Sequence, residues 1–204
     1  MKSGANDMMR KTLMLPLLIL ALAGAGCSAP TVPKEQYFRL TAGAAQAKLA
    51  HPLAGIVEVV PLTADGVTGE RPLLFTADGT KLEQRNYAYW TDVPIAMIRD
   101  QVIAYLRSAG AAEQVVPSEL RLGGSYRIQG DIKRLEQAAG PKADTGIIEL
   151  ELSVIDENDD HLVLSKVYHA EHAAKDHSID AAVAALNAGL DDVLKQFAAD
   201  LDAR

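Results

Sequence analysis

The sequence predicts an α+β fold, in which an antiparallel sheet carries two main helices on one face of a single compact domain. Three observations lead to this prediction. Stretches of alternating apolar and polar residues recur along the chain and are separated by short turns. Two longer stretches repeat apolar residues at helical spacing. The chain has 204 residues, of which 49% are hydrophobic, and this size suits one domain.

Six stretches have the alternation or the composition of β-strands. In the fifth, Ile148, Leu150 and Leu152 alternate with Glu149 and Glu151, so one face of the strand is expected to be buried. The stretch 72–90 contains Asp-Gly and reads as a hairpin. The residues DENDD (156–160) are expected to turn the chain between the stretches 147–155 and 161–173. The stretches are QYFRL (36–40), GIVEVVPL (55–62), PLLFTADGTKLEQRNYAYW (72–90), YRIQGDIKRLE (126–136), IIELELSVI (147–155) and HLVLSKVYHAEHA (161–173).

The first predicted helix follows the aromatic residues YAYW. Thr91 or Asp92 can cap it, Pro94 suits its first turn, and Gly110 ends it. Its apolar residues form one stripe, which we expect to face the sheet. The stripe consists of Ile95, Ile98, Val102, Tyr105 and Leu106.

The second predicted helix begins after Ser178, with Asp180 near its positive end. Apolar residues recur every three or four positions over about five turns. They are Ile179, Val183, Leu186, Leu190, Val193 and Phe197. A coiled-coil seam is the alternative, but the run is shorter than three heptads, which favours packing on the domain's own sheet.

The charge of the chain limits its partners. The formal net charge of −7 argues against nucleic acid, because binding to phosphates requires clustered Lys and Arg. It also argues against adhesion to anionic lipid by charge alone. Attachment to a membrane must therefore come from another feature.

The first 26 residues have the organisation of a secretory signal peptide. Basic residues precede an apolar stretch from Thr12 to Ala25, and the stretch ends in small residues. It is shorter than the roughly 20 apolar residues that span a bilayer. The true start is Met1, Met8 or Met9, since the shorter forms also carry a complete signal.

The apolar stretch ends at Cys27, the only cysteine of the chain. With Gly24, Ala25 and Gly26 before it, the site resembles the lipobox of bacterial lipoproteins, whose cysteine carries acyl chains such as palmitate after cleavage. Two or more acyl chains anchor a protein stably. An ordinary signal peptide with an incidental cysteine is the alternative. Ser28 stands where an aspartate would favour the inner membrane, so we expect the periplasmic face of the outer membrane.

The chain is thus divided into a lipoprotein signal peptide (1–26), a short tether after the lipidated cysteine (27–35) and one domain (36–204). Fully extended, the tether reaches about 35 Å. We therefore expect the domain to stay close to the lipid surface.

No motif for metal binding or catalysis is present in the sequence. HAEHAAKDH places His169 and His172 on opposite faces of a strand, where they cannot share one ion. DENDDH lacks the Gly and the Glu of a calcium loop and reads as a polar turn. Nucleophile and phosphate-binding patterns are also missing. We predict no catalytic residue, no metal, no cofactor and no enzymatic activity.

The stretch YAYWTDVP contains the only tryptophan of the chain. Aromatic residues at the junction of a strand and a helix usually pack in the core, and that interpretation is favoured for this stretch. The alternative is a contact with a partner or with lipid, because Tyr and Trp suit half-exposed interfaces. Tyr89 and Trp90 are the candidate residues for such a contact.

Four features in this order resemble the ABC-type transport auxiliary lipoproteins, the PqiC-like family. They are Cys27 in a lipobox, YFRL soon after it, VEVVPL as the next strand, and LEQRNYAYWTDVPIAMIRDQVIAYLRSAG leading from an aromatic strand into a helix. A late strand pair and a C-terminal helix complete the resemblance, which covers the mature chain. The sequence departs from the family pattern at Gly24 and in YWTDVP.

The resemblance implies an accessory subunit of an intermembrane lipid transport system that pairs an ATPase and a permease with a periplasmic MCE-domain protein. The lipoprotein would dock the MCE component, contribute to membrane integrity and catalyse nothing. An open edge strand would also permit a homo-oligomer or ring. The alternative is an assembly or structural lipoprotein of the outer membrane without a transport role.

Overall fold

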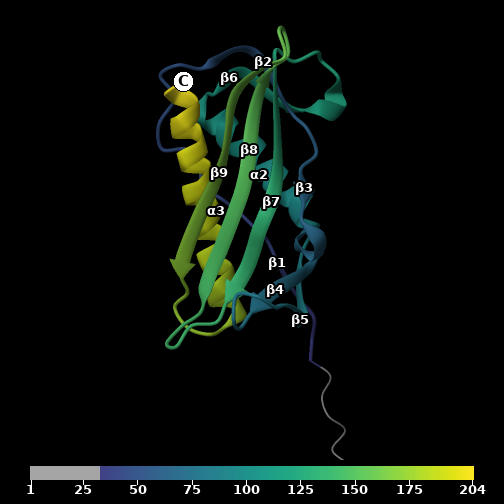
Figure 1. Ribbon diagram of the computed structural model, residues 1–204, viewed down its shortest axis with the longest axis vertical. Helices are drawn as coiled ribbons and strands as arrows, with labels where there is room; N and C mark the ends of the chain where they lie inside the picture. Colours follow the sequence, from purple (N-terminus) through teal and green to yellow (C-terminus); the bar gives the residue numbers. More distant parts are fainter. Residues whose placement is uncertain (1–32) are drawn as a thin grey trace, which may run out of the picture. The chain divides into compact units, whose positions relative to one another are not determined.

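A mixed nine-stranded sheet with two long helices makes up residues 33–204, the part of the chain that the computed structural model describes (Figure 1). The strands are β1 (Gln36–Phe38), β2 (Leu53–Val59), β3 (Thr63–Ala64), β4 (Pro72–Thr76), β5 (Leu82–Trp90), β6 (Ala112–Pro117), β7 (Tyr126–Ala138), β8 (Thr145–Asp156) and β9 (His161–Ala173). The helices are α2 (Pro94–Ala109) and α3 (Ile179–Asp202), with short 3-10 turns η1 (Gly66–Gly69) and η2 (Ser118–Leu120). The predicted α+β class and both predicted helices are confirmed.

Strand β7 is the centre of the sheet. One of its edges pairs antiparallel with β8 along its whole length, and β9 pairs antiparallel with β8 in turn. The other edge pairs in parallel with β2, β3 and β4 one after another. Strand β6 adds in parallel to β2, while β5 and then β1 extend the sheet from β4. The sheet is therefore mixed, and the expectation of antiparallel pairing holds only for the pairs β4–β5, β7–β8 and β8–β9.

The first hairpin turns at the predicted Asp-Gly. Gly79 has φ +76°, a left-handed conformation that glycine adopts without strain. One Asp78 carboxylate oxygen accepts hydrogen bonds from the backbone of Lys81 and Thr80 and from the Thr80 hydroxyl. These bonds stabilise the carboxylate and lower the pKa of Asp78 to about 2.

The N-cap of helix α2 lies one residue after Asp92 and two after Thr91, the two predicted caps. Val93 is the N-cap, and it offers no side-chain hydrogen bond. The Asp92 carboxylate instead accepts a hydrogen bond from the Val93 backbone N–H at 2.7 Å. Pro94 fills the first helical position, where no N–H is needed, and Gly110 ends the helix with φ +61°.

Helix α3 begins at the predicted cap. The Ser178 hydroxyl accepts a hydrogen bond from the Ala181 N–H at 3.2 Å. Two glycines then let the helix approach the sheet closely. A Cβ on Gly146 of β8 would lie 2.8 Å from the Leu186 backbone nitrogen, and one on Gly189 would lie 2.9 Å from Ile148.

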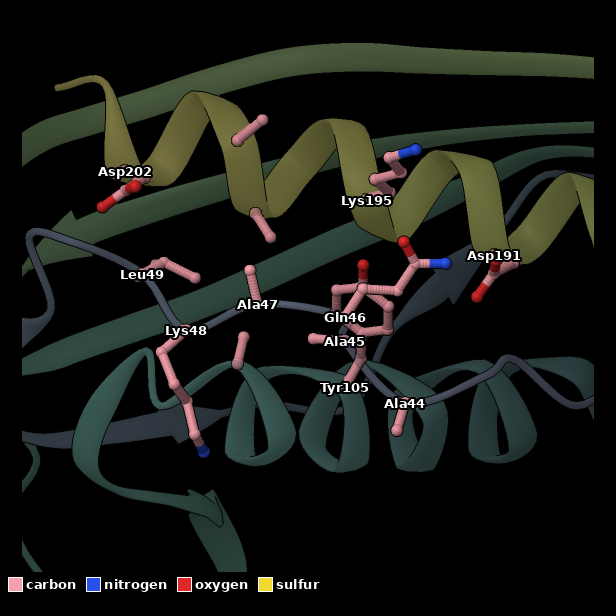
Figure 2. Close-up of a pocket in the computed structure, with 13 residues that line it drawn as sticks. Ala44, Ala45, Gln46, Ala47, Lys48, Leu49, Tyr105, Asp191, Lys195 and Asp202 are labelled. Carbon is pink, nitrogen blue, oxygen red and sulfur yellow. The ribbon is translucent and has the colours of Figure 1, made fainter.

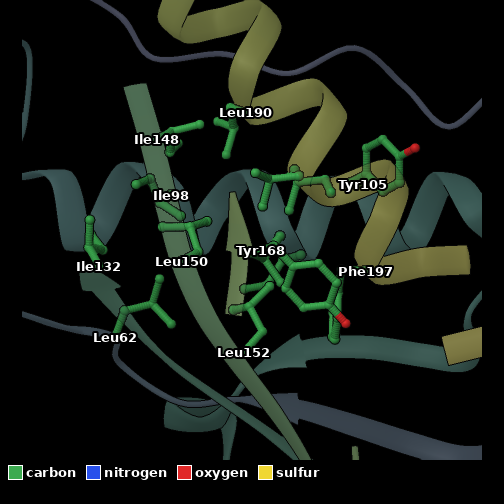
Figure 3. Packing of buried hydrophobic residues seen from close by; sticks show 14 of the residues in the cluster. Leu62, Ile98, Tyr105, Ile132, Ile148, Leu150, Leu152, Tyr168, Leu190 and Phe197 are labelled. Atoms are coloured by element: carbon green, nitrogen blue, oxygen red, sulfur yellow. The ribbon is translucent and has the colours of Figure 1, made fainter. Parts of the chain in front are cut away.

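The core lies between the helices and one face of β7, β8 and β9 (Figure 3). The predicted alternation in β8 is confirmed, since Ile148, Leu150, Leu152 and Val154 are at most 1% exposed. Phe197 of α3 packs edge-on against the Tyr168 ring, with ring centroids 5.7 Å apart. The opposite face of β7 and β8 carries charged side chains, as expected for a face that no helix covers (Figure 1).

Candidate functional site

The tether joins the domain at β1, an edge strand that pairs in parallel with β5. Tyr37 of β1 lies opposite Tyr89, and Phe38 lies opposite Trp90. Since neighbouring residues of a strand point to opposite faces, the two pairs face different surroundings. Trp90 is 2% exposed and belongs to the core, against which Phe38 also packs.

The Tyr37 and Tyr89 rings form an aromatic pair on the other face, with centroids 5.8 Å apart. The Arg71 guanidinium lies over the Tyr37 ring, 5.6 Å from its centroid, at a distance suited to a cation–π interaction. The Tyr37 hydroxyl donates a hydrogen bond to the Glu35 carboxylate, which raises the pKa of the tyrosine. Tyr37 keeps 54% of its surface exposed, so the pair is accessible to a partner.

Arg71 links the Tyr37–Tyr89 pair to the backbone of β5. Its guanidinium donates two hydrogen bonds of 3.2 Å to the Trp90 carbonyl, and the Trp90 N–H donates to the Arg71 carbonyl at 2.7 Å. Nearby, Tyr87 has φ +61° in a stretch where the β4–β5 register shifts, and its side chain is 40% exposed. We call Tyr37, Arg71, Tyr87 and Tyr89 the aromatic edge.

Tyr89 and Trp90, the two candidate contact residues of the sequence analysis, thus have different surroundings. The burial of Trp90 favours the core interpretation for that side chain. Tyr89 lies on the aromatic edge, and a contact through it remains a prediction. Tyr37 and Arg71 were not recognised from sequence, although the period-two alternation of QYFRL already places Tyr37 on the face opposite Phe38.

The predicted lipid attachment site, Cys27, lies outside the described residues. Within residues 33–204, no helix has the length and apolar character needed to cross a bilayer.

His169 and His172 of β9 lie on opposite faces of the strand, as predicted. His169 contacts the carboxylates of Glu149 and Glu171 at 3.1 Å each, on the face without helices. His172 contacts Asp192 of α3 at 2.8 Å on the other face. No group of three or more His, Cys, Asp or Glu side chains within residues 33–204 is placed to hold a metal ion.

The acidic stretch between β8 and β9 forms the predicted hairpin turn. The Asp156 carboxylate accepts a hydrogen bond from the Asn158 N–H at 2.9 Å, and Asp160 takes a left-handed φ of +55°. These local bonds are typical of a polar turn.

A buried polar cluster lies near the start of α3 and has no counterpart in the sequence predictions. Gln137 and Asp144 are 1% and 3% exposed. The Gln137 amide donates to one Asp144 oxygen at 2.5 Å, and His177 contacts the other at 2.7 Å. Burial raises the pKa of Asp144, but the hydrogen bonds outweigh it and hold the pKa below the ordinary value. This cluster is structural, since every member has a partner.

Several solved structures share this fold. Protein XCC0632 from Xanthomonas campestris is 18% identical, with a TM-score of 0.70 over 82% of this chain and 99% of that chain. An uncharacterized protein is 14% identical, with a TM-score of 0.67 over 83% of this chain and 99% of that one. The hypothetical protein CT253 from Chlamydia trachomatis is 9% identical, with a TM-score of 0.51 over 74% and 97%. At these identities the likeness concerns the fold alone.

A search of curated proteins finds no match to the chain. A family model, described as the ABC-type transport auxiliary lipoprotein component, matches residues 38–198. The match runs from the last residue of β1 to Ala198 of α3 and so includes strands β2 to β9, helix α2, most of α3 and three of the four residues of the aromatic edge. The description names an auxiliary component of transport and no catalytic activity. The chain therefore belongs to the family of ABC-type transport auxiliary lipoproteins.

Proposed function

We propose that the chain is a periplasmic lipoprotein of the outer membrane and an accessory subunit of an ABC/MCE-type intermembrane lipid transport system. Acyl chains on Cys27 anchor it, and the domain docks the periplasmic MCE component. Through this role it contributes to membrane integrity. The family match over residues 38–198 carries the proposal, because the family is defined as an auxiliary component of ABC-type transport.

The anchoring part is supported by the order of features along the chain. Cys27 follows an apolar run that ends in small residues, and β1 begins at Gln36. The tether between them has a maximum reach of about 35 Å. An anchored Cys27 would therefore keep β1 and the aromatic edge near the lipid headgroups, where tyrosine side chains are favoured.

Two surfaces support the docking part. Strand β9 pairs only with β8 among the described strands, so its outer edge offers unpaired backbone groups to a second chain. The aromatic edge offers exposed tyrosines beside an arginine, the residue types enriched in protein interfaces. An open edge of this kind also suits a homo-oligomer or ring.

The proposal is tested by isolating the tagged full-length chain from native membranes after mild cross-linking. We expect mass spectrometry to identify an ATPase, a permease and an MCE-domain protein in the isolate. Tyr37→Ala and Tyr89→Ala should reduce their recovery, whereas the exposed Ala184→Ser on α3 should not. Isolation of outer-membrane assembly proteins without any transporter subunit would contradict the transport role and favour an assembly lipoprotein.

A further inference from the structure

Residues 118–125 join β6 to β7, and we call this segment the tip loop. Two of its leucines, Leu120 and Leu122, are 55% and 51% exposed. Strand β9 begins at the same end of the sheet, because β7 and β9 both run antiparallel to β8, and its Leu162 is 54% exposed. A single exposed leucine is common on a protein surface, whereas several at one end of a domain indicate an interaction site.

Hydrogen bonds to α2 and β2 hold the tip loop in place. The Arg99 guanidinium of α2 bonds to both oxygens of the Glu119 carboxylate and donates to the Val59 carbonyl at 3.0 and 3.1 Å. The Glu58 carboxylate of β2 accepts the Leu122 N–H at 3.1 Å. A loop that is fixed before binding loses little conformational entropy when it binds, so the leucines of the tip loop are preorganised for a contact.

The groove between residues 41–51 and the two helices has a different character (Figure 2). Its volume is about 270 Å³, but two of its charged groups are already bonded within the chain. The Asp191 carboxylate accepts the Gly43 N–H at 3.0 Å, and the Lys48 ammonium donates to the Ser108 carbonyl at 2.9 Å. The exposed leucines of the tip loop are therefore the stronger indication of a binding surface.

The tip loop and the start of β1 lie toward opposite ends of the sheet (Figure 1). Strand β1 runs parallel to β5, β5 runs antiparallel to β4, and β4 runs parallel to β7. Strand β1 therefore runs opposite to β7, which begins directly after the tip loop. In a chain anchored through Cys27, we expect the tether to enter the domain from the other end and the tip loop to face away from the lipid.

Acidic side chains beside the leucines determine which partner fits. The turn between β8 and β9, residues 156–160, carries four carboxylates. It lies beside the tip loop, because the Glu157 N–H donates to the Ser125 carbonyl at 2.9 Å. Glu157 pairs with Arg127, but the three aspartates of the turn form no ion pair with any residue from 33 to 204. Arg121 of the tip loop offsets only one of these charges, so this end repels anionic lipid and attracts a basic protein surface.

We propose that Leu120 and Leu122 insert into an apolar groove of a protein partner, and that Lys or Arg side chains around this groove face the acidic turn 156–160. The inference rests on the proposed function, and it names the surface through which the chain binds the periplasmic component of the transporter. The leucines supply the apolar contact area. The unpaired aspartates orient the partner and make the contact sensitive to salt.

The test isolates the tagged full-length chain from native membranes after mild cross-linking and compares how much MCE-domain protein each variant recovers. The double variant Leu120→Ser with Leu122→Ser should lower this recovery about tenfold, because two anchor side chains are lost. The matched control Leu82→Ser changes an exposed leucine at the other end of the sheet and should leave recovery unchanged. Circular dichroism of each variant checks that the domain stays folded.

The charge of the turn is tested separately. Asp159→Lys with Asp160→Lys places positive charge opposite the basic surface of the partner and should lower recovery severalfold. Glu83→Lys with Asp180→Lys makes the same change of charge at exposed positions near the other end of the sheet and should have no effect. Equal effects of the two charge reversals would overturn the assignment of a basic surface to the partner.

Three results would overturn the inference as a whole. The first is unchanged recovery by the leucine double variant, and the second is an equal loss with Leu82→Ser. The third is binding of the Cys27→Ala chain to phosphatidylglycerol vesicles that the leucine double variant loses, which would make lipid the occupant. If Tyr37→Ala lowers recovery and the leucine double variant does not, the transport role stands and only this inference fails. If the parent chain recovers no transporter subunit, the proposed function fails with it.

Discussion

His177 Nδ1 lies 2.7 Å from Asp144 Oδ1, and this contact joins the residue before the α3 cap to the loop between β7 and β8. Gln137 of β7 contacts the other oxygen of the same carboxylate. One buried carboxylate thus ties the central strand to the start of α3.

Replacing Asp144 with alanine should therefore destabilise the domain. The substitution leaves the buried Gln137 amide without its acceptor, and an unsatisfied buried polar group costs about 1–3 kcal/mol. Urea unfolding followed by circular dichroism measures the change. Asp100→Ala, at an exposed position on α2, is the control and should change stability by less than about 0.5 kcal/mol. Equal effects of both substitutions would refute the structural role of the cluster.

The same carboxylate should make stability depend on pH. The pKa of Asp144 is lower in the folded chain than its ordinary value of 3.8, so the unfolded chain binds the proton first as the pH falls. Its contribution is complete above about pH 5 and is lost as the pH falls through the folded pKa. Asp144→Asn should flatten the plot of unfolding free energy against pH below pH 5. An unchanged slope would contradict the lowered pKa.

Gly146→Ala and Gly189→Ala should have clearly different effects. A Cβ on Gly146 meets the backbone of α3, which can move only as a unit, so we expect a loss of about 1–3 kcal/mol. On Gly189 the nearest atom is the Ile148 Cγ2 methyl, a side-chain atom and not backbone, and alanine also gains up to about 1 kcal/mol of helix propensity. The net change there should be smaller. Thermal unfolding of the two variants measures the loss of stability in each. A larger loss for Gly189→Ala than for Gly146→Ala would contradict the prediction.

Ser178→Ala should cost about 1 kcal/mol, because the Ala181 N–H loses its acceptor at the start of α3. Ser178→Asp keeps an acceptor at the same place and should be nearly neutral. Denaturant midpoints of the two variants check this expectation. If the aspartate variant loses as much as the alanine variant, the cap bond is not what stabilises this helix end.

Cys27→Ala should move the protein from the membrane fraction to the soluble periplasmic fraction while leaving the domain folded. The acyl chains provide the anchor in our proposal, and two or more chains are needed for stable attachment. Cell fractionation and circular dichroism measure the two properties. Cys27→Ser, which also removes the thiol, should behave in the same way. Recovery of either variant in the membrane fraction would contradict acyl anchoring.

The sequence predicted the elements of the fold better than their pairing. Alternation in β8 and the helical stripe of α3 directly encode which face is buried, and both predictions are confirmed. Alternation carries no information on whether a neighbouring strand runs in the same direction. The parallel pairs along β7 were therefore missed. Strand β6 was also missed, because its sequence AEQVVP neither alternates nor forms a long apolar run.

The surfaces were harder to predict than the core. Residues 41–51 lie against α2 and α3, which are far from them in sequence, and no local pattern in this alanine-rich segment signals that position. Trp90 and Tyr89 are neighbours in sequence, but the strand sends one into the core and the other to the aromatic edge. The sequence could have distinguished a buried Trp90 from an exposed Tyr89 only if the face of β5 on which each side chain lies had been known.

The pairing of β7 also has a consequence for the order of folding. Residues 126–202 form a continuous unit in which each of the strands β7, β8 and β9 pairs with its neighbour in sequence, and α3 then returns over them. The earlier strands must find β7 across long chain separations, which slows their docking. We expect the C-terminal half to gain amide protection first in pulsed hydrogen exchange. The half that is synthesised first would then be the last to become structured, and simultaneous protection of both halves would contradict this order.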